Sequence, residues 1–350
     1  MRQRVLEGIR EDGPIGFDTY MALCLYDPDA GFFASDTVRA GTDGDFVTSP
    51  EVSPWFGRLI GRWAAEQFPQ GTATLLEVGG GTGALLEALV VESGDAFGEI
   101  AAVELSPGAR RSIGERVPRS RLFADVAELP ADVPVVVVVN ELLDNLPTRL
   151  VERTAGGWNE LLVGESDGAL GFVSAPADSE LSAWCDRRLG SVHNGAVLAA
   201  QIEVEQWLTK LLGHFSSARV LVIDYADSTS RLAERPRQDI VRTFARQRSG
   251  HDLFAEPGST DITLEVNSDV VVSAIEDLGA SVTVTDQRTF LTCLGADEAI
   301  ESLVEVSHER ARSGDVMGQL VAASEAKGLR ALLDPSGLGG FAVISISSGT

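Results

Sequence analysis

The residues best suited to chemistry in this sequence form a glycine-rich segment that follows a carboxylate. Glu77 lies in a short apolar run of strand length, and Gly79, Gly81 and Gly83 follow at alternate positions. Glycine tolerates positive φ angles and lets a ligand approach the backbone closely, so this spacing predicts a tight turn at a binding site. Helix-forming residues occupy 84–89, and the start of such a helix presents free N–H groups. The segment is therefore predicted to be a strand, a glycine turn and a helix.

Two classes of ligand fit this turn. The spacing Gly79-x-Gly81-x-x-Ala84 matches the fingerprint for dinucleotides such as NAD. The pattern Glu77-x-Gly79-x-Gly81-x-Gly83 is a better match to the acidic, alternating-glycine segment of class I proteins that bind S-adenosylmethionine. A carboxylate here suits an ammonium and a sulfonium group and would repel a pyrophosphate. The segment therefore favours S-adenosylmethionine, with NAD and a turn without a ligand as the alternatives.

Further acidic residues are expected at the same edge of the sheet. Glu104 ends a second predicted strand, 100–104, about 20 residues beyond the glycines, where a carboxylate binds ribose hydroxyls in a doubly wound sheet. Asp125 ends a third predicted strand, 121–125, and is interpreted either as a neighbour of the adenine or as the cap of a helix. Both residues are candidate cofactor ligands.

Polar residues also follow the most apolar run of the sequence. Residues 133–139 are too few to span a bilayer and predict a strand buried on both faces. Asn140 and Glu141 come directly after this strand, and Asp144 lies one turn further on. Because ligands bind beyond the carboxyl ends of the central strands in open α/β sheets, these three are the candidate catalytic residues. The alternative is an Asn-Glu pair that only caps a helix.

Composition narrows the functional classes. The 350 residues are 44% apolar, enough for one large domain with insertions or for two, and their formal net charge is -24. Such a charge disfavours nucleic acid and anionic membranes as partners. Three scattered cysteines and the lack of a CxxC or HExxH pattern predict reduced thiols and no metal site. Residues 1–10 lack the apolar core of a signal peptide, so a cytoplasmic location is expected.

Periodicity and turn residues indicate the remaining elements. Predicted helices cover most of residues 1–30, 55–68, 270–278 and 296–334. Predicted strands are a hairpin within 148–165, a parallel strand at 219–225 and closing strands at 282–285 and 341–347. Residues 231–265 are predicted to be a long polar loop, whose arginines are expected to be solvated or ion-paired.

Several of these stretches together resemble the MidA-type methyltransferases, the family of the mitochondrial complex I assembly factor that methylates a protein arginine. The resemblance covers roughly residues 14 to 295. It is carried by Leu25-Tyr26-Asp27-Pro28, Gly44-Asp45-Phe46-x-Thr48-Ser49-Pro50-Glu51, the glycine turn, Asn140-Glu141-x-x-Asp144-x-Leu146-Pro147, Ile223-Asp224-Tyr225 and Pro257-Gly258-x-x-Asp261-Ile262-Thr263. The chain departs from the family at Gly80 and Thr82, where proline and arginine are usual, and at Leu142-Leu143, where the family has two phenylalanines.

The resemblance implies an α/β fold with a doubly wound, mostly parallel, seven-stranded class I methyltransferase (Rossmann-like) sheet. The expected organisation is an N-terminal helical lid at residues 1–70 and a methyltransferase domain at 71–350, with insertions at about 148–215 and 231–265. The implied cofactor is S-adenosylmethionine, over which Asp45, Phe46 and Thr48 would close. The implied partner is a protein substrate, a respiratory complex I subunit in the family's example, and the protein is expected to be a monomer or homodimer.

The predicted reaction is in-line methyl transfer to an arginine guanidinium of a protein. Glu141 is the first candidate for the carboxylate that orients the guanidinium, and Asp144 is the second. Other classes stay open at this point: a methyltransferase acting on a small molecule, an NAD-dependent oxidoreductase on a similar sheet, and a non-catalytic assembly factor that retains the cofactor site.

Overall fold

The computed structural model describes residues 1–34, 48–245 and 248–349, and its contacts divide the chain into two compact units. We call the first the sheet unit; it comprises Thr37–Glu141, Leu212–Asp224 and Ala280–Thr350. The second, the hairpin unit, comprises Met1–Asp36, Leu142–Leu211 and Tyr225–Gly279. Each unit is therefore assembled from segments that lie far apart in the sequence.

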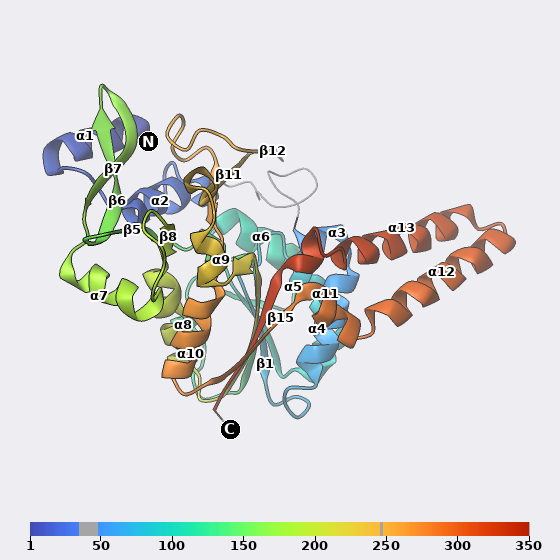
Figure 1. Ribbon diagram of the computed structural model, residues 1–350. Helices are drawn as coiled ribbons and strands as arrows, with labels where there is room; N and C mark the ends of the chain where they lie inside the picture. Colours follow the sequence, from blue (N-terminus) through green and yellow to red (C-terminus); the bar gives the residue numbers. More distant parts are fainter. Residues whose placement is uncertain (35–47, 246–247, 350) are drawn as a thin grey trace. The chain divides into compact units, whose positions relative to one another are not determined.

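The sheet unit is built on seven strands in the order β15-β16-β9-β4-β1-β2-β3. Of these, β1 and β15 are labelled in Figure 1. They are β1 (Thr74–Val78), β2 (Glu99–Val103), β3 (Arg121–Phe123), β4 (Val135–Asn140), β9 (Ala218–Asp224), β15 (Ser281–Asp286) and β16 (Ala342–Ser348). Neighbouring strands are parallel except at β16, which runs antiparallel to both β9 and β15. The predicted doubly wound, mostly parallel seven-stranded sheet is confirmed.

The centre of this sheet is formed by its most apolar strands. The five valines of β4 are fully buried between β1 and β9, as expected for a parallel strand that is covered on both faces. The helices of the unit are α3 (Ser49–Val52), α4 (Trp55–Ala65), α5 (Ala84–Ser93), α6 (Pro107–Arg116), α11 (Gln287–Cys293), α12 (Ala296–Arg312) and α13 (Val316–Leu332). Buried side chains of α4 and α5 join β1 and β4 in one core cluster.

The hairpin unit contains a four-stranded antiparallel sheet in the order β7-β6-β5-β8. These strands are β5 (Arg149–Thr154), β6 (Gly157–Ser166), β7 (Ala169–Pro176) and β8 (Val197–Ala200). Its helices are α1 (Arg2–Asp12), α2 (Phe17–Tyr26), α7 (Ser179–Arg188), α9 (Thr229–Ala233) and α10 (Ser268–Asp277). Smaller sheets are formed by β11 (Val241–Ala245), β12 (Arg248–Ser249) and β13 (Asp261–Leu264), and by β10 (Ala226–Asp227) and β14 (Val266–Asn267). Helix α8 (Ile202–His214) contributes residues to both units.

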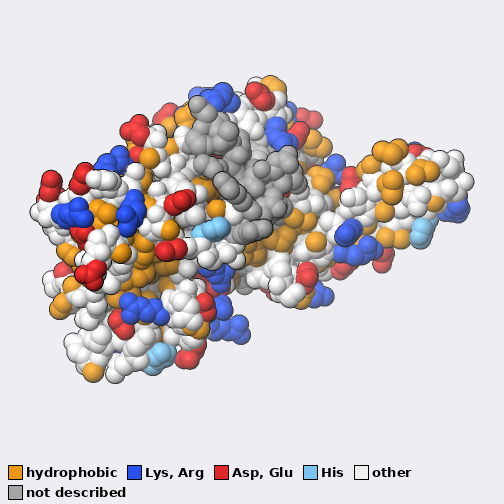
Figure 2. All heavy atoms as spheres, turned by 90° about the horizontal axis from the view of Figure 1, so that it is seen from above, with side chains coloured by type: hydrophobic (Ala, Val, Ile, Leu, Met, Phe, Trp, Pro, Cys, Tyr) orange, Lys and Arg blue, Asp and Glu red, His pale blue; other side chains and the backbone are white. Residues whose placement is uncertain are grey.

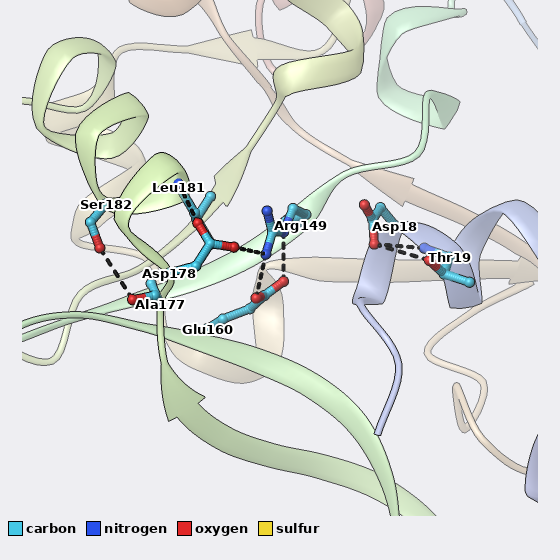
Figure 3. Close-up of polar contacts among 8 residues, drawn as sticks. All are labelled: Asp18, Thr19, Arg149, Glu160, Ala177, Asp178, Leu181 and Ser182. Atoms are coloured by element: carbon cyan, nitrogen blue, oxygen red, sulfur yellow. Dashed lines mark hydrogen bonds and ion pairs between the residues drawn. The ribbon is translucent and has the colours of Figure 1, made fainter. Parts of the chain in front are cut away.

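Arg149 links two strands of the antiparallel sheet to the start of α7 (Figure 3). Arg149 on β5 donates to both carboxylate oxygens of Glu160, at 2.7 and 2.6 Å, and also to Asp178 at 3.4 Å. Asp178 in turn caps α7 by accepting a hydrogen bond from the backbone N–H of Leu181 at 2.7 Å. Because the planar guanidinium matches the carboxylate geometry, the bidentate contact aligns β5 with β6. The longer contact to Asp178 connects these strands to the start of α7.

The N-terminal segments fall into different units. Ile15 exchanges two backbone hydrogen bonds with Val163 of β6, and the ring of Phe17 lies 5.7 Å from that of Phe172 on β7. Helices α1 and α2 therefore belong to the hairpin unit, whereas α3 and α4 pack in the sheet unit. The lid predicted at residues 1–70 thus combines segments that belong to different units.

The prediction of a long polar loop over residues 231–265 is wrong. This segment contains the end of α9, a 3-10 turn at Arg237–Asp239, and strands β11 and β13, which pair with each other. The expectation of ion-paired arginines is confirmed for Arg235 and Arg242, which both contact Glu265 at 3.1 Å. Among the helices in the described ranges, none combines the length and the hydrophobicity that a membrane crossing requires.

Candidate cofactor and catalytic site

The glycine segment forms the predicted strand, turn and helix. β1 ends at Val78, and α5 begins at Ala84. Gly79, Gly81 and Gly83 have φ angles of 76°, 50° and 82°, in the left-handed region that side chains disfavour. A Cβ on Gly83 would also lie only 3.0 Å from the Cα of Ile113. The turn therefore requires glycine both for its backbone angles and for close packing.

Glu77 presents a buried carboxyl group beside this turn. Its side chain is 3% exposed, and its Oε2 atom has no hydrogen-bond partner among the described residues. Burial, together with the nearby charge of Glu104, raises the pKa of Glu77 to about 8, although the backbone N–H of Leu86 bonds to the carboxyl group. A Cβ on Gly80 would lie 2.9 Å from Oε2, so glycine at this position leaves space beside the carboxyl group.

Glu104 brings a second carboxylate to the same turn. Its Oε2 accepts a hydrogen bond from the backbone N–H of Gly81 at 3.1 Å, and its Oε1 accepts one from Ser106 at 2.8 Å. Burial raises the pKa of Glu104 despite these bonds. Two partly desolvated carboxylates that disfavour each other's ionisation would be stabilised by a cation, and a pyrophosphate would be repelled. The turn thus fits the positively charged end of the predicted cofactor.

The raised pKa of Glu77 predicts a pH dependence of stability. The folded protein holds this proton more tightly than an unfolded chain, in which the pKa is near 4.5. The contribution of Glu77 is therefore fully present below pH 4.5 and falls by up to about 1.4 kcal/mol per pH unit as the pH rises toward 8. Glu77→Gln removes this loss, so without ligand the variant should become more stable than the wild type as the pH approaches 8.

Urea unfolding of the ligand-free protein between pH 5 and pH 8.5 measures this difference. Glu87→Gln on α5 is the matched control, because that side chain is 46% exposed. This substitution should not reproduce the gain in stability over the wild type that Glu77→Gln shows as the pH approaches 8. A stability difference between Glu77→Gln and the wild type that stays constant over the pH range would contradict the assignment.

A contact between α3 and the glycine turn was not predicted from the sequence. The hydroxyl of Thr82 donates a hydrogen bond to Glu51 on α3, and the backbone carbonyl of Thr82 accepts one from Ser112 on α6 at 2.8 Å. Thr48, a predicted cofactor contact, is the N-cap residue of α3 and is half-buried. Its predicted neighbours Asp45 and Phe46 lie outside the described residues. Glu51 belongs to the same sequence motif as Thr48. Its place in that motif could have identified it as a residue near the cofactor.

Asn140 and Glu141 lie at the carboxyl end of β4, as predicted. Asn140 donates from Nδ2 to Oε1 of Glu141 at 3.0 Å, and the backbone N–H of Glu141 donates to Ile223 on β9 at 2.9 Å. Glu141 has a φ angle of 50°. Asp167 is the other described non-glycine residue with positive φ, and it lies in the turn between β6 and β7, where this conformation is ordinary. Glu141 does not lie in a hairpin turn, so its left-handed backbone conformation is strained. Such strain makes Glu141 a candidate functional residue.

Asp144 belongs to the hairpin unit and is buried in a 3-10 turn, Leu143–Asn145. The next residue, Asn145, donates to Oδ1 of Asp261 at 2.8 Å and to the carbonyl of Ile262 at 3.1 Å. The hydroxyl of Tyr26 donates to the carbonyl of Asn145 at 3.0 Å. Residues from two distant motifs therefore hold the turn that carries Asp144.

Asp125 caps a helix, one of its two predicted interpretations. Its side chain accepts a hydrogen bond from Ala127 at 2.8 Å, and Glu128 accepts one from the backbone N–H of Asp125 at 3.0 Å. This capping box begins a 3-10 turn, Val126–Glu128. A contact with adenine stays a prediction.

Comparisons with known proteins agree with this geometry. A family model described as "Putative S-adenosyl-L-methionine-dependent methyltransferase" matches residues 59–285. Protein arginine methyltransferase NDUFAF7, mitochondrial, of Rattus norvegicus is 25% identical over 350 residues, which cover 87% of this chain and 76% of the relative. Its Homo sapiens counterpart is 25% identical over 347 residues, with 88% and 76% covered.

A solved structure is similar over nearly the whole chain. It is a COG1565 superfamily member from Burkholderia thailandensis bound to S-adenosyl-homocysteine. It is 29% identical, with a TM-score of 0.84, and the match covers 99% of this chain and 92% of that one. Since the family model also matches more than half of the sequence, this chain belongs to that family of S-adenosyl-L-methionine-dependent methyltransferases, and its cofactor is S-adenosylmethionine.

Proposed function

We propose that this protein methylates an arginine side chain of a protein substrate. The observation that carries the proposal is Glu141, a carboxylate with a strained backbone directly after the central strand β4. A guanidinium is planar and binds a carboxylate through paired hydrogen bonds, so a fixed carboxylate at the ligand-binding edge suits this acceptor. The names of the two mitochondrial relatives support the same substrate class.

The residues at the glycine turn would hold the cofactor. Glu77 is the candidate partner of its amino-acid end, Glu104 of its ribose, and the glycines leave the backbone open to close approach. When bound, S-adenosylmethionine supplies an electrophilic methyl group on a sulfonium sulfur. The contact from Glu51 to Thr82 would keep the turn in place from the α3 side.

The role of Glu141 follows from the chemistry of the acceptor. A guanidinium has a pKa above about 12 and is protonated in water, so its nitrogen is a poor nucleophile. A carboxylate that accepts its N–H bonds orients the reacting nitrogen and stabilises the charge that remains on the group. Asn140 is a positioning residue, because its amide holds Oε1 of Glu141 at 3.0 Å. Asp144 is the second candidate for the same contact.

Transfer of labelled methyl groups tests the proposal. The purified protein and S-adenosylmethionine with a deuterated methyl group are added to a lysate of cells that lack the gene, and the proteins are analysed by mass spectrometry. We expect deuterated methyl groups on arginines of at least one protein. Label found only on small molecules would overturn the arginine proposal in favour of a small-molecule methyltransferase. Binding of the cofactor without any transfer would favour a non-catalytic assembly factor.

A further inference from the structure

The antiparallel helical hairpin formed by α12 and α13 extends away from the sheet of its own unit (Figure 1). Its base is held firmly. Gln287 donates to the backbone carbonyl of Leu332 at 3.0 Å, and the indole N–H of Trp55 donates to Glu325 at 2.9 Å. A Cβ on Gly328 would lie 2.8 Å from the carbonyl oxygen of Val52, so α13 packs closely against α3. The hairpin is thus a fixed part of the unit.

Helix α13 has two apolar faces, and only one is packed. Ala322, Ala326, Leu329 and Leu332 are buried. Met317, Leu320 and Val321 lie on the other face and are 71%, 57% and 54% exposed. With Val316, which is 61% exposed, they form what we call the α13 patch. Figure 2 shows hydrophobic side chains gathered near the tip of this hairpin. An apolar stripe of this kind on a soluble protein marks an interaction surface.

The charges around the patch narrow the choice of partner. Residues 316–324 include no charged side chain, although 23% of the whole chain is charged. A strongly basic partner would find no acid within this stripe to pair with. A second copy of the chain would bury no unpaired charge there, and only the general repulsion between two molecules of charge -24 would oppose its binding.

The order of large and small residues also suits a second copy. Met317, Leu320, Val321 and Ser324 follow the i, i+3, i+4, i+7 spacing of one helix face. If two α13 helices pack antiparallel about a two-fold axis between Leu320 and Val321, Leu320 of one protomer lies opposite Val321 of its partner. Met317 then lies opposite the small Ser324. The stripe is therefore complementary to itself, as an isologous interface requires.

We propose that the α13 patch is a homodimer interface in which two α13 helices pack antiparallel. One pair of helices buries less than the standard interface of about 1,600 Å². The dimer should therefore be reversible and should dissociate on dilution. Because salt screens the repulsion between the acidic protomers, the dimer should tighten as the ionic strength rises.

Sedimentation velocity over a concentration series tests this surface. The wild type should pass from monomer to dimer, and Leu320→Glu should raise the dissociation constant at least tenfold. Val91→Glu is the matched control, since Val91 is 68% exposed on α5 of the same unit and should leave the dimer unchanged. A wild type that stays monomeric up to high micromolar concentration, or a dimer that tolerates Leu320→Glu, would overturn the proposal.

A crosslinking measurement guards against a variant that merely unfolds. In a Cys293→Ser background, Leu320→Cys should form an intermolecular disulfide under mild oxidation, because the two cysteines would lie close to the two-fold axis. Glu305→Cys on the exposed side of α12 should not form one. Equal crosslinking at both positions would indicate random collisions and would count against the interface.

Discussion

Gly81→Val is expected to abolish S-adenosylmethionine binding while the protein stays folded. Gly81 has a φ angle of 50°, and its N–H donates to Glu104 at 3.1 Å. A β-branched residue is strained at this angle, at a cost of about 1–3 kcal/mol, so the backbone would shift and move the N–H away from the carboxylate. The valine methyl groups would also occupy the space through which the cofactor approaches the turn. Isothermal titration calorimetry should show an affinity reduced at least about 100-fold, the equivalent of 2.7 kcal/mol.

The matched control is Gly71→Val. Gly71 precedes β1 at the opposite end of the strand, has a φ angle of 75°, and has open space where its side chain would be built. Valine at position 71 introduces the same kind of backbone strain, but at a distance from the glycine turn. The Gly71→Val variant should therefore lose stability and keep its affinity for the cofactor. Thermal unfolding of both variants separates misfolding from lost binding. If Gly81→Val binds with unchanged affinity, the turn is not the cofactor site.

The parts of the fold that the sequence predicts are those encoded by local patterns. The valine run of β4 reads as a buried strand because burial on both faces requires an unbroken apolar run. The glycines after β1 predict the turn because few other residues adopt its angles. Parallel strands present their carboxyl ends at one edge of the sheet. The predicted strands therefore place four candidate site residues at that edge: Glu77, Glu104, Asn140 and Glu141.

The parts that were missed depend on partners distant in the chain. β11 and β13 are short strands of mixed polar and apolar residues, and they pair across the intervening residues 246–260. Helices α1 and α2 belong with β6 and β7 through contacts such as Ile15 with Val163, which no local pattern reveals. The role of Thr82, where the chain departs from the family pattern, also depends on a residue distant in the chain. Thr82 stands where the family pattern has an arginine, and its hydroxyl bonds to Glu51 on α3.

Glu141→Gln is expected to keep cofactor binding and to lose methyl transfer. The substitution preserves shape, and the amide oxygen can still accept the hydrogen bond from Asn140, now at 3.0 Å. Glutamine also tolerates the φ angle of 50° about as well as glutamate does. What is lost is the negative charge that orients a guanidinium and stabilises its positive charge during attack. Loss of one such electrostatic contact lowers turnover by about 100-fold or more.

Single-turnover transfer of labelled methyl groups, with cofactor affinity measured in parallel, checks this expectation. Glu234→Gln is the control, because that side chain is 76% exposed in the hairpin unit and should leave both quantities unchanged. Asp144→Asn decides between the two candidate carboxylates. Turnover retained in Glu141→Gln and lost in Asp144→Asn would move the orienting role to Asp144. Turnover retained in both variants would remove both residues from the mechanism, and the acceptor would then have to be a nucleophile that needs no carboxylate to orient it.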